Sequence, residues 1–317
     1  MNLRNLMINN VKDLSIDNDT NVTQIFNELL CSGGFQSKNL AEGFNILSSM
    51  INDKKCLRFC SFVGSIISTG LRGIIRDMIK KKWFDVVITT CGALDHDIAR
   101  YYTKYKSGNF ASNDKKLAND NIHRLGNILI PSNNYGQIIE NKMQLFLKNN
   151  NYSNGDNIAV SDVTKLIGKN MGEESFLYWA YKNDIPVIVP GIMDGAVGTQ
   201  IWLFIQRNQN LRLNITSDSD LLSSMVFKAK KSGAFMVGGG ISKHHTLWWN
   251  QYKGGLDYAV YITTSEEFDG SSSGATISEA ISWGKVKQDA KQTTIHAEAT
   301  TVLPFLYRGL LDKVKSN

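Results

Sequence analysis

Six short runs of apolar or β-branched residues, each ending in small or polar residues and followed by a helix-like stretch, most constrain how this chain folds. Short runs without polar alternation are typical of strands buried on both faces of a sheet. Strands that alternate with helices form βαβ units, whose right-handed crossovers place helices on both faces. We therefore predict an α/β fold with a doubly wound, mostly parallel, Rossmann-like sheet. The six runs are Leu57–Val63, Asp85–Thr90, Pro186–Pro190, Ala234–Val237, Tyr258–Thr263 and Thr294–Ala297.

Two regions fall outside this plan. Residues 1–50 have a helical pattern, with Asn18–Thr20 as the expected cap of a helix over Val22–Leu30. Residues 104–175 are rich in Asn and Lys, and we expect surface helices and loops there. A length of 317 residues allows one large domain or two small ones, and only four prolines favour one compact unit. We predict a helical N-terminal extension over 1–50 and a single domain over 51–317.

Composition excludes several classes of protein. The chain is 42% hydrophobic and 20% charged, which excludes wholesale disorder, and its net charge of +6 is spread along the sequence. No apolar run suits a secretory signal or a membrane span. The four cysteines, at 31, 56, 60 and 91, match no zinc spacing. We expect a cytoplasmic protein with no metal, no membrane contact and no nucleic-acid partner.

Chemically active side chains gather where the predicted strands end. Carboxyl ends of parallel strands meet at one edge of a sheet, where ligands bind in such folds. Carboxylates collected there favour a polycationic ligand, although each could instead cap a helix. The glycine triplet could contact a phosphate or simply make a tight turn, and the adjacent histidines would face different directions on a helix. These residues are Thr89–Gly92, Asp95–Asp97, Asp194–Gly195, Gly238–Gly240, Ser242–His245, Thr263–Gly274 and Glu298–Ala299.

The segment Ser278–Lys285 points to covalent chemistry. Gly284 is expected to end a helix in the left-handed conformation, which would hold Lys285 at a fixed place beside Trp283. A lysine against an aromatic face in a desolvated pocket can act as a Schiff-base nucleophile. The alternative is a solvated lysine at a helix end, and by spacing alone Lys243 is an equal rival.

Five stretches carry a recognisable combination of motifs: TTCGALDHDIAR (89–100), RLGNILIP (124–131), PVIVPGIMDGAVG (186–198), VGGGISKHH (237–245) and DYAVYITTSEEFDGSSSGATISEAISWGKVKQDA (257–290). Together they resemble one family, deoxyhypusine synthase, and particularly its shorter archaeal-type members. The last stretch is the most specific, because it combines EEFDGS and SGA with EA and SWGK. The resemblance extends, with weaker motifs, over almost the whole chain.

The resemblance implies a particular reaction. Members of this family oxidise spermidine with NAD, release 1,3-diaminopropane, and carry the 4-aminobutyl group as an imine on an enzyme lysine. The group passes to one lysine of the precursor of translation initiation factor 5A, and the imine is then reduced. The family is homotetrameric, with active sites at dimer interfaces.

Carried over to this sequence, the resemblance implies that Lys285 forms the imine and that His244 transfers protons. It implies substrate contacts by Trp283, Glu279, Asp95, His96, Gly270, Ser271, Ser272, Ser273 and Gly274. It implies NAD contacts by Gly64, Ser65, Ser68, Thr90, Cys91, Gly92, Asp194, Thr264, Ser265, Asp269, Glu298 and Ala299.

The resemblance breaks down, relative to eukaryotic members, at positions whose side chains bind the amine groups of spermidine. Those members carry aspartate where this chain has Thr199 and Ser272, and an acid where it has His96. Two other functions therefore stay open: formation of homospermidine with putrescine as acceptor, and nucleotide binding without catalysis. The acids that could substitute are Asp95, Asp97, Glu266, Glu267 and Glu279.

Overall fold

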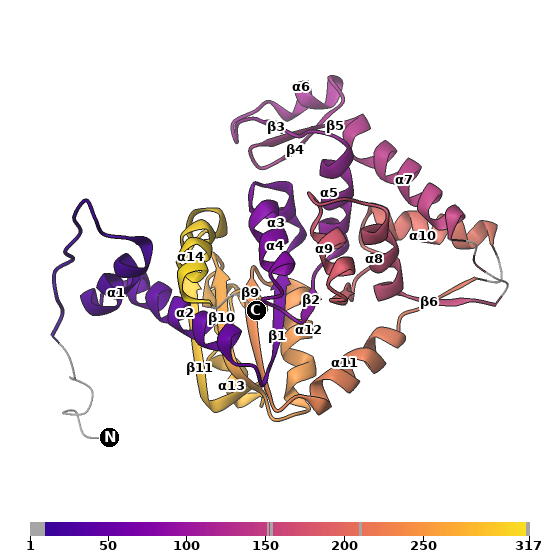
Figure 1. The fold of residues 1–317 in the computed structure, drawn as a ribbon. Helices are drawn as coiled ribbons and strands as arrows, with labels where there is room; N and C mark the ends of the chain where they lie inside the picture. The colour runs from indigo at the N-terminus through magenta and orange to yellow at the C-terminus, as the bar shows by residue number, and fades with distance from the viewer. Residues whose placement is uncertain (1–9, 151, 153–154, 209–210, 315–317) are drawn as a thin grey trace.

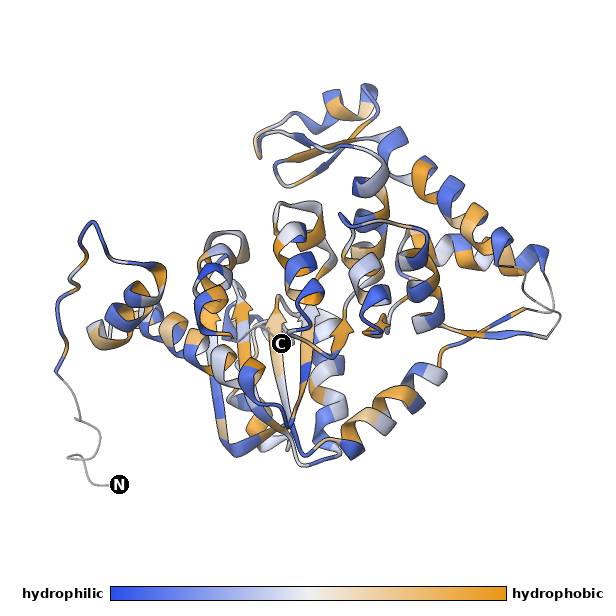
Figure 2. Ribbon diagram, in the orientation of Figure 1, coloured by the Kyte–Doolittle hydropathy of each residue, from blue (hydrophilic) through white to orange (hydrophobic). Residues whose placement is uncertain are grey.

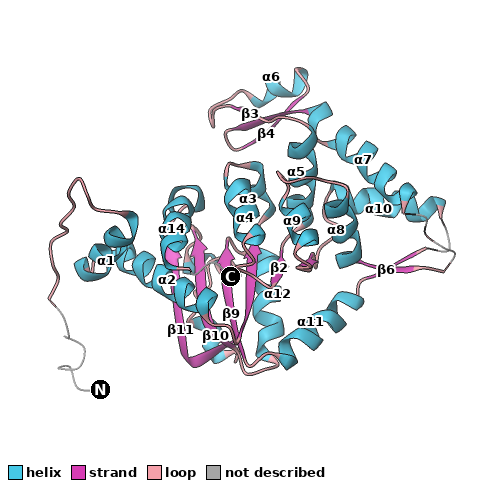
Figure 3. Cartoon of the chain, in the orientation of Figure 1, coloured by secondary structure: helices cyan, strands magenta, loops and turns pink. Residues whose placement is uncertain are grey.

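A computed structural model describes residues 10–150, 152, 155–208 and 211–314. A parallel sheet of six strands forms its centre, with helices on both sides (Figures 1 and 3). All six predicted strands belong to this sheet, so the predicted α/β class is confirmed. The strands are β1 (Cys56–Phe62), β2 (Val86–Ile88), β7 (Val187–Ile188), β9 (Lys231–Val237), β10 (Leu256–Thr263) and β11 (Val286–His296).

The order of the strands defines where a ligand can bind. Across the sheet they run β11-β10-β9-β1-β2-β7, so the chain moves outward from β1 to β7 and then returns to the other side of β1. This is the 3-2-1-4-5-6 order of dinucleotide-binding folds. The direction of winding reverses between β1 and β9, and the crevice beyond their carboxyl ends is the usual ligand site.

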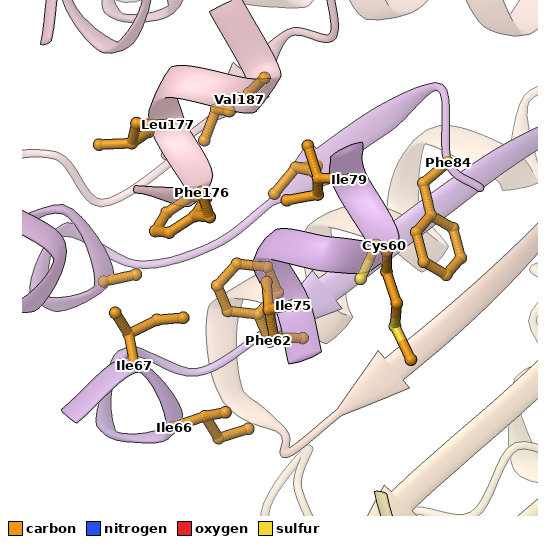
Figure 4. Close-up of a cluster of buried hydrophobic side chains, with 14 of the residues drawn as sticks. Cys60, Phe62, Ile66, Ile67, Ile75, Ile79, Phe84, Phe176, Leu177 and Val187 are labelled. Carbon is orange, nitrogen blue, oxygen red and sulfur yellow. The ribbon is translucent and has the colours of Figure 1, made fainter. Parts of the chain in front are cut away.

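Successive side chains of the central strands alternate between two separate hydrophobic cores, one on each face of the sheet. In β9, Phe235 and Val237 pack with α2, α4 and α14, whereas Ala234 and Met236 pack with α11 and α12. The strands are correspondingly apolar in Figure 2. Figure 4 shows the first core where Phe62 meets α3, α4 and α9; its ring lies 5.6 Å from that of Phe176. Burial on both faces explains why these strands lack polar alternation.

The helices in chain order follow the strands as predicted, with additional ones in 104–175. They are α1 (Val22–Ser32), α2 (Phe35–Asn52), α3 (Gly64–Ser68), α4 (Leu71–Lys80), α5 (Cys91–Tyr102), α6 (Asp114–Asn119), η2 (Ser132–Asn134), α7 (Gly136–Asn149), α8 (Val160–Lys169), α9 (Phe176–Lys182), α10 (Ala196–Arg207), α11 (Ser217–Lys228), α12 (Gly240–Gln251), η3 (Glu267–Asp269), α13 (Glu279–Ser282) and α14 (Ala299–Lys313).

In the described part of the N-terminal region, the first helix begins at residue 22. Residues 10–21 contain no helix, and Asn21, not Asn18–Thr20, caps α1 through a capping box with Gln24. Residues 1–9 lie outside the described part of the chain. Helix α2 buries Phe44 completely in the core, and this ring stacks on Phe26 at 4.2 Å. The division of the chain at residue 50 stays a prediction.

Strands also occur where only helices and loops were expected. An antiparallel sheet is formed by β3 (Lys106–Ser107), β4 (Ile122–Leu125) and β5 (Ile128–Pro131), and β6 (Asn157–Ala159) pairs with β8 (Arg212–Asn214). These strands have only two to four residues, too few to leave a clear hydrophobic pattern.

The last strand of the main sheet is also longer than predicted. The sequence pattern indicated residues 294–297, but β11 begins at Val286 and ends at His296. It lies at the edge of the sheet, so polar residues such as Lys287 and Asp289 are accommodated there.

Candidate active site

A cavity of about 470 Å³ lies between α12 and the segment that connects β10 to β11. It brings together seven residues predicted for the catalytic and substrate site: His244, Gly270, Ser271, Ser272, Glu279, Trp283 and Lys285. We call it the lysine pocket. Its other lining residues are Lys243, Leu247, Trp248, Gln251, Ala275, Thr276 and Ala280.

Lys285 is held by the end of α13. Gly284 has φ of +67°, the left-handed conformation that the sequence predicted, and it allows the Lys285 amide to bond the Ala280 carbonyl at 3.0 Å. The Nζ atom then lies 5.2 Å from the Trp283 ring centre and 5.8 Å from that of Trp248. No carboxylate of the described residues pairs with it.

Lys243, the rival, has a different environment. Its side chain is buried, and Nζ donates to the carbonyls of Ser272 (2.7 Å) and Ala275 (2.5 Å). The same atom lies 4.0 Å from the centre of the Tyr261 ring. Burial lowers the pKa of Lys243 to about 8. Its amine is thus committed to holding the segment 272–275 against α12.

The two adjacent histidines point in different directions, as the helical spacing predicted. His245 accepts a hydrogen bond from Trp249 Nε1 at 3.1 Å, and burial lowers its pKa to about 4. His244 faces the lysine pocket. Burial, followed by the positive charges of Lys285 and Lys243, lowers the pKa of His244, which favours a neutral imidazole.

The glycine triplet serves packing. The Gly238 amide donates to the Ile262 carbonyl at 2.9 Å, and the Gly240 amide donates to Ser273 Oγ at 3.1 Å. A Cβ atom at Gly239 would lie 2.2 Å from Ser273 Oγ. The triplet therefore lets the segment 270–274 approach the end of β9, and two of its amides already have partners.

The carboxyl edge of the sheet carries most residues predicted to contact NAD. Ser65, Asp194 and Glu298 are exposed there at or beside the starts of helices, and Thr264 is exposed directly after β10. Asp269 lies in the segment after β10, where its carboxylate accepts from the Ser271 amide at 2.7 Å. Exposed hydroxyls and carboxylates at such an edge fit the hydroxyl groups of a dinucleotide.

Other predicted NAD residues act within the protein. A Cβ atom at Gly64 would lie 2.8 Å from backbone atoms of Gly92 and Ala93, so Gly64 allows α3 to pack against α5. Ser68 is buried and donates to the Ser65 carbonyl, and Cys91 is fully buried. Thr90 Oγ1 accepts from the Gly64 amide at 3.1 Å. Ser265 follows β10, and Ala299 begins α14.

Asp95 does not line the lysine pocket in this chain. Its carboxylate accepts hydrogen bonds from Tyr135 Oη (2.8 Å) and from the amides of Ala196 (3.0 Å) and Val197 (2.8 Å). It therefore caps α10 from α5. Desolvation raises the pKa of Asp95, opposed by these donors.

His96 and Asp97 are also buried. His96 Nδ1 bonds Tyr105 Oη at 2.9 Å, and burial lowers the pKa of the imidazole to about 4. Asp97 accepts from Arg72 Nε and Ser175 Oγ, both at 2.6 Å, and from the Leu177 amide at 3.2 Å. The substrate roles predicted for Asp95 and His96 stay predictions.

The sequence analysis did not name Trp248 as a pocket residue, although its spacing from His244 could have indicated it. Trp248 lies four residues after His244, the spacing that places two side chains on the same face of a helix. The contacts of Tyr135 and Arg72 with the acids of α5 had no such signal, because they join residues far apart in the sequence.

No cluster of three His, Cys, Asp or Glu side chains among the described residues could hold a metal ion. None of the described helices is both long and apolar enough to cross a membrane.

Fold and site together define a class: an α/β protein of dinucleotide-binding topology with a lysine pocket on one face of its sheet. The family model for deoxyhypusine synthase matches residues 24–310. A probable deoxyhypusine synthase of Thermoplasma volcanium is 48% identical and that of Picrophilus torridus 46%, each over 98% of this chain and 100% of the relative. The chain therefore belongs to the deoxyhypusine synthase family, enzymes that transfer a group in hypusine biosynthesis.

Solved structures agree on the fold. The crystal structure of a putative deoxyhypusine synthase from Entamoeba histolytica matches with a TM-score of 0.64 and 20% identity. The match covers 97% of this chain and 99% of that one.

Proposed function

We propose that this protein transfers the 4-aminobutyl group of spermidine to one lysine of the precursor of translation initiation factor 5A, through an imine on Lys285. The observation that carries the proposal is the Lys285 amine, which lies within 6 Å of two indole ring centres in a pocket that also contains His244 and Glu279. Family membership supports the same activity.

The pocket suits an alkyl polyamine. Spermidine is a polycation, so an ammonium end needs a carboxylate, and Glu279 is an exposed acid on the pocket wall. The Trp283 ring offers an apolar surface to the methylene groups and a π face to a cation. The hydroxyl-bearing segment 270–274 supplies further hydrogen-bond groups along the same wall.

NAD is the cofactor that the proposal requires, and the carboxyl edge has groups suited to hold it. Bound there by residues such as Ser65, Asp194, Thr264 and Glu298, NAD would accept a hydride from spermidine and later return it. The reversal of winding between β1 and β9 supports this assignment, because dinucleotides bind beyond the carboxyl ends of the strands at such a reversal.

The step assigned to Lys285 is an imine exchange. The neutral Nζ attacks the oxidised carbon of spermidine, a new carbon–nitrogen bond forms, and 1,3-diaminopropane leaves with the proton that Nζ gives up. His244, whose lowered pKa favours the neutral imidazole, can relay that proton. The acceptor lysine of the factor then displaces Lys285 by the same exchange, which frees Nζ again.

We further propose a homotetramer in the cytoplasm, with each active site completed at a subunit interface. Two observations suit this arrangement: the exposed fractions of Trp248 and Trp283 are 42% and 67% in the single chain. A lysine that carries a reactive imine needs more protection from water than these exposed rings give it, and a second subunit would supply that protection.

Borohydride trapping tests the proposal. The protein is mixed with NAD and labelled spermidine, reduced with borohydride, digested and mapped by mass spectrometry. We expect a 4-aminobutyl adduct on Lys285, no adduct in Lys285→Ala, and transfer of the label to the factor when it is added. An adduct on Lys243 would overturn the lysine assignment. Product analysis with putrescine in place of the factor separates this activity from homospermidine formation.

A further inference from the structure

Helix α12 presents a row of aromatic side chains to the lysine pocket and the solvent beside it. His244, Trp248 and Tyr252 follow at intervals of four residues, which places them on one face. The His244 and Trp248 rings are stacked at 5.8 Å with an interplanar angle of 28°, and the Trp248 and Tyr252 rings meet edge to face at 6.1 Å. Trp248 is the member of the row whose ring faces Lys285.

Trp283 approaches Lys285 from a different segment of the chain. It follows the last residue of α13, and Gly284 turns the chain so that Lys285 returns toward α12. The Lys285 Nζ atom is therefore within 6 Å of two indole rings from separate parts of the fold, at 5.2 and 5.8 Å. Contacts of this length attract a cation to the ring face.

The same two rings suit a chain attached to Lys285. A protonated imine keeps the positive charge at Nζ and adds a row of methylene groups. Flat aromatic walls bind both parts: their π faces attract the cation, and their apolar surface packs against the methylenes. Glu279 then remains for the ammonium at the far end of the chain.

We propose that Trp248 is a specificity-determining residue for the amine donor, forming with Trp283 a two-indole clamp around Lys285 and the unbranched alkyl chain that it carries. This inference deepens the proposed function and rests on it for the identity of the donor. Trp248 contacts the donor directly, whereas Lys243 acts by holding the segment 272–275.

Three variants test the clamp. Trp248→Ala removes the ring, Trp248→Phe keeps an aromatic face, and Trp202→Ala removes a tryptophan of similar exposure (49%) on α10, outside the pocket. Each is measured for spermidine affinity by calorimetry, for KM and kcat separately, and for the yield of borohydride-trapped Lys285. Thermal unfolding confirms that each variant is folded.

We expect Trp248→Ala to weaken spermidine binding and raise KM about 3- to 30-fold, the range of a cation–π contact with its apolar surface. Trp248→Phe should recover most of the loss, and Trp202→Ala should match the wild type. Equal spermidine affinity in the wild type and Trp248→Ala would overturn the clamp, as would a Phe variant as weak as the Ala variant. Wild-type protein that binds spermidine but yields no Lys285 adduct would instead overturn the proposed function.

Discussion

Helix α5 and the lysine pocket both contain acids that suit a polyamine, but their carboxylates are in opposite situations. Asp95 and Asp97 are buried, and protein donors already occupy their oxygens. Glu279 is exposed on the pocket wall and takes part in none of the ion pairs among the described residues. Glu279 therefore has oxygens available to a ligand ammonium group, whereas the oxygens of Asp95 and Asp97 are already bonded within the protein.

The sharpest test of this comparison is the buried ion pair between Arg72 of α4 and Asp97 of α5. Asp97→Ala leaves the Arg72 guanidinium buried without its carboxylate, so we expect a loss of about 3–5 kcal/mol in the free energy of unfolding. Urea denaturation measures it. The matched control is Asp77→Ala at the half-exposed Arg76–Asp77 pair, where the change should stay within about 1 kcal/mol. Equal losses would show that Asp97 has no special structural role.

The opposite behaviour is expected in the pocket. Glu279→Gln should leave the free energy of unfolding unchanged and raise the KM for spermidine about 10- to 100-fold, because a charge-assisted hydrogen bond to an ammonium group becomes a neutral one. Steady-state kinetics measures the change. Glu267→Gln, an exposed acid outside the pocket lining, is the control and should have a normal KM. A raised KM in Glu267→Gln with a normal KM in Glu279→Gln would instead assign the amine contact to Glu267 in η3.

The smallest expected effect concerns pH. Burial lowers the pKa of His96 to about 4 from an ordinary value of 6.5, so the unfolded chain binds a proton that the folded chain does not. The free energy of unfolding should therefore fall as pH drops from about 6.5 toward 4. His96→Gln should remove up to about 2 kcal/mol of the fall between pH 7 and 5, measured by urea denaturation at both values.

Asp95 titrates in the opposite sense, because its pKa is raised, but it is present in both proteins and cancels in the difference. Identical pH slopes in the wild type and His96→Gln would contradict the burial of a neutral imidazole.

Local sequence could predict the central fold because both faces of its strands are buried. The errors have related causes: β11 lies at the edge and tolerates Lys287 and Asp289, and the strands of 104–175 have only two to four residues. In the site, the left-handed Gly284 and the divergence of His244 and His245 follow from local geometry. The partners of Asp95 do not, because Tyr135 and Ala196 reach it only after the chain has folded.

The contacts of the segment 270–276 limit which insertions this part of the sequence can tolerate during evolution. On one side Ser273 fills the space above Gly239, and on the other Lys243 holds the carbonyls of Ser272 and Ala275. One insertion would misalign the segment with the strand ends and with α12 together. We therefore expect a library of single-residue insertions to be tolerated in the exposed turns of 104–175 and to be depleted here, in a stretch that composition alone would mark as a variable loop.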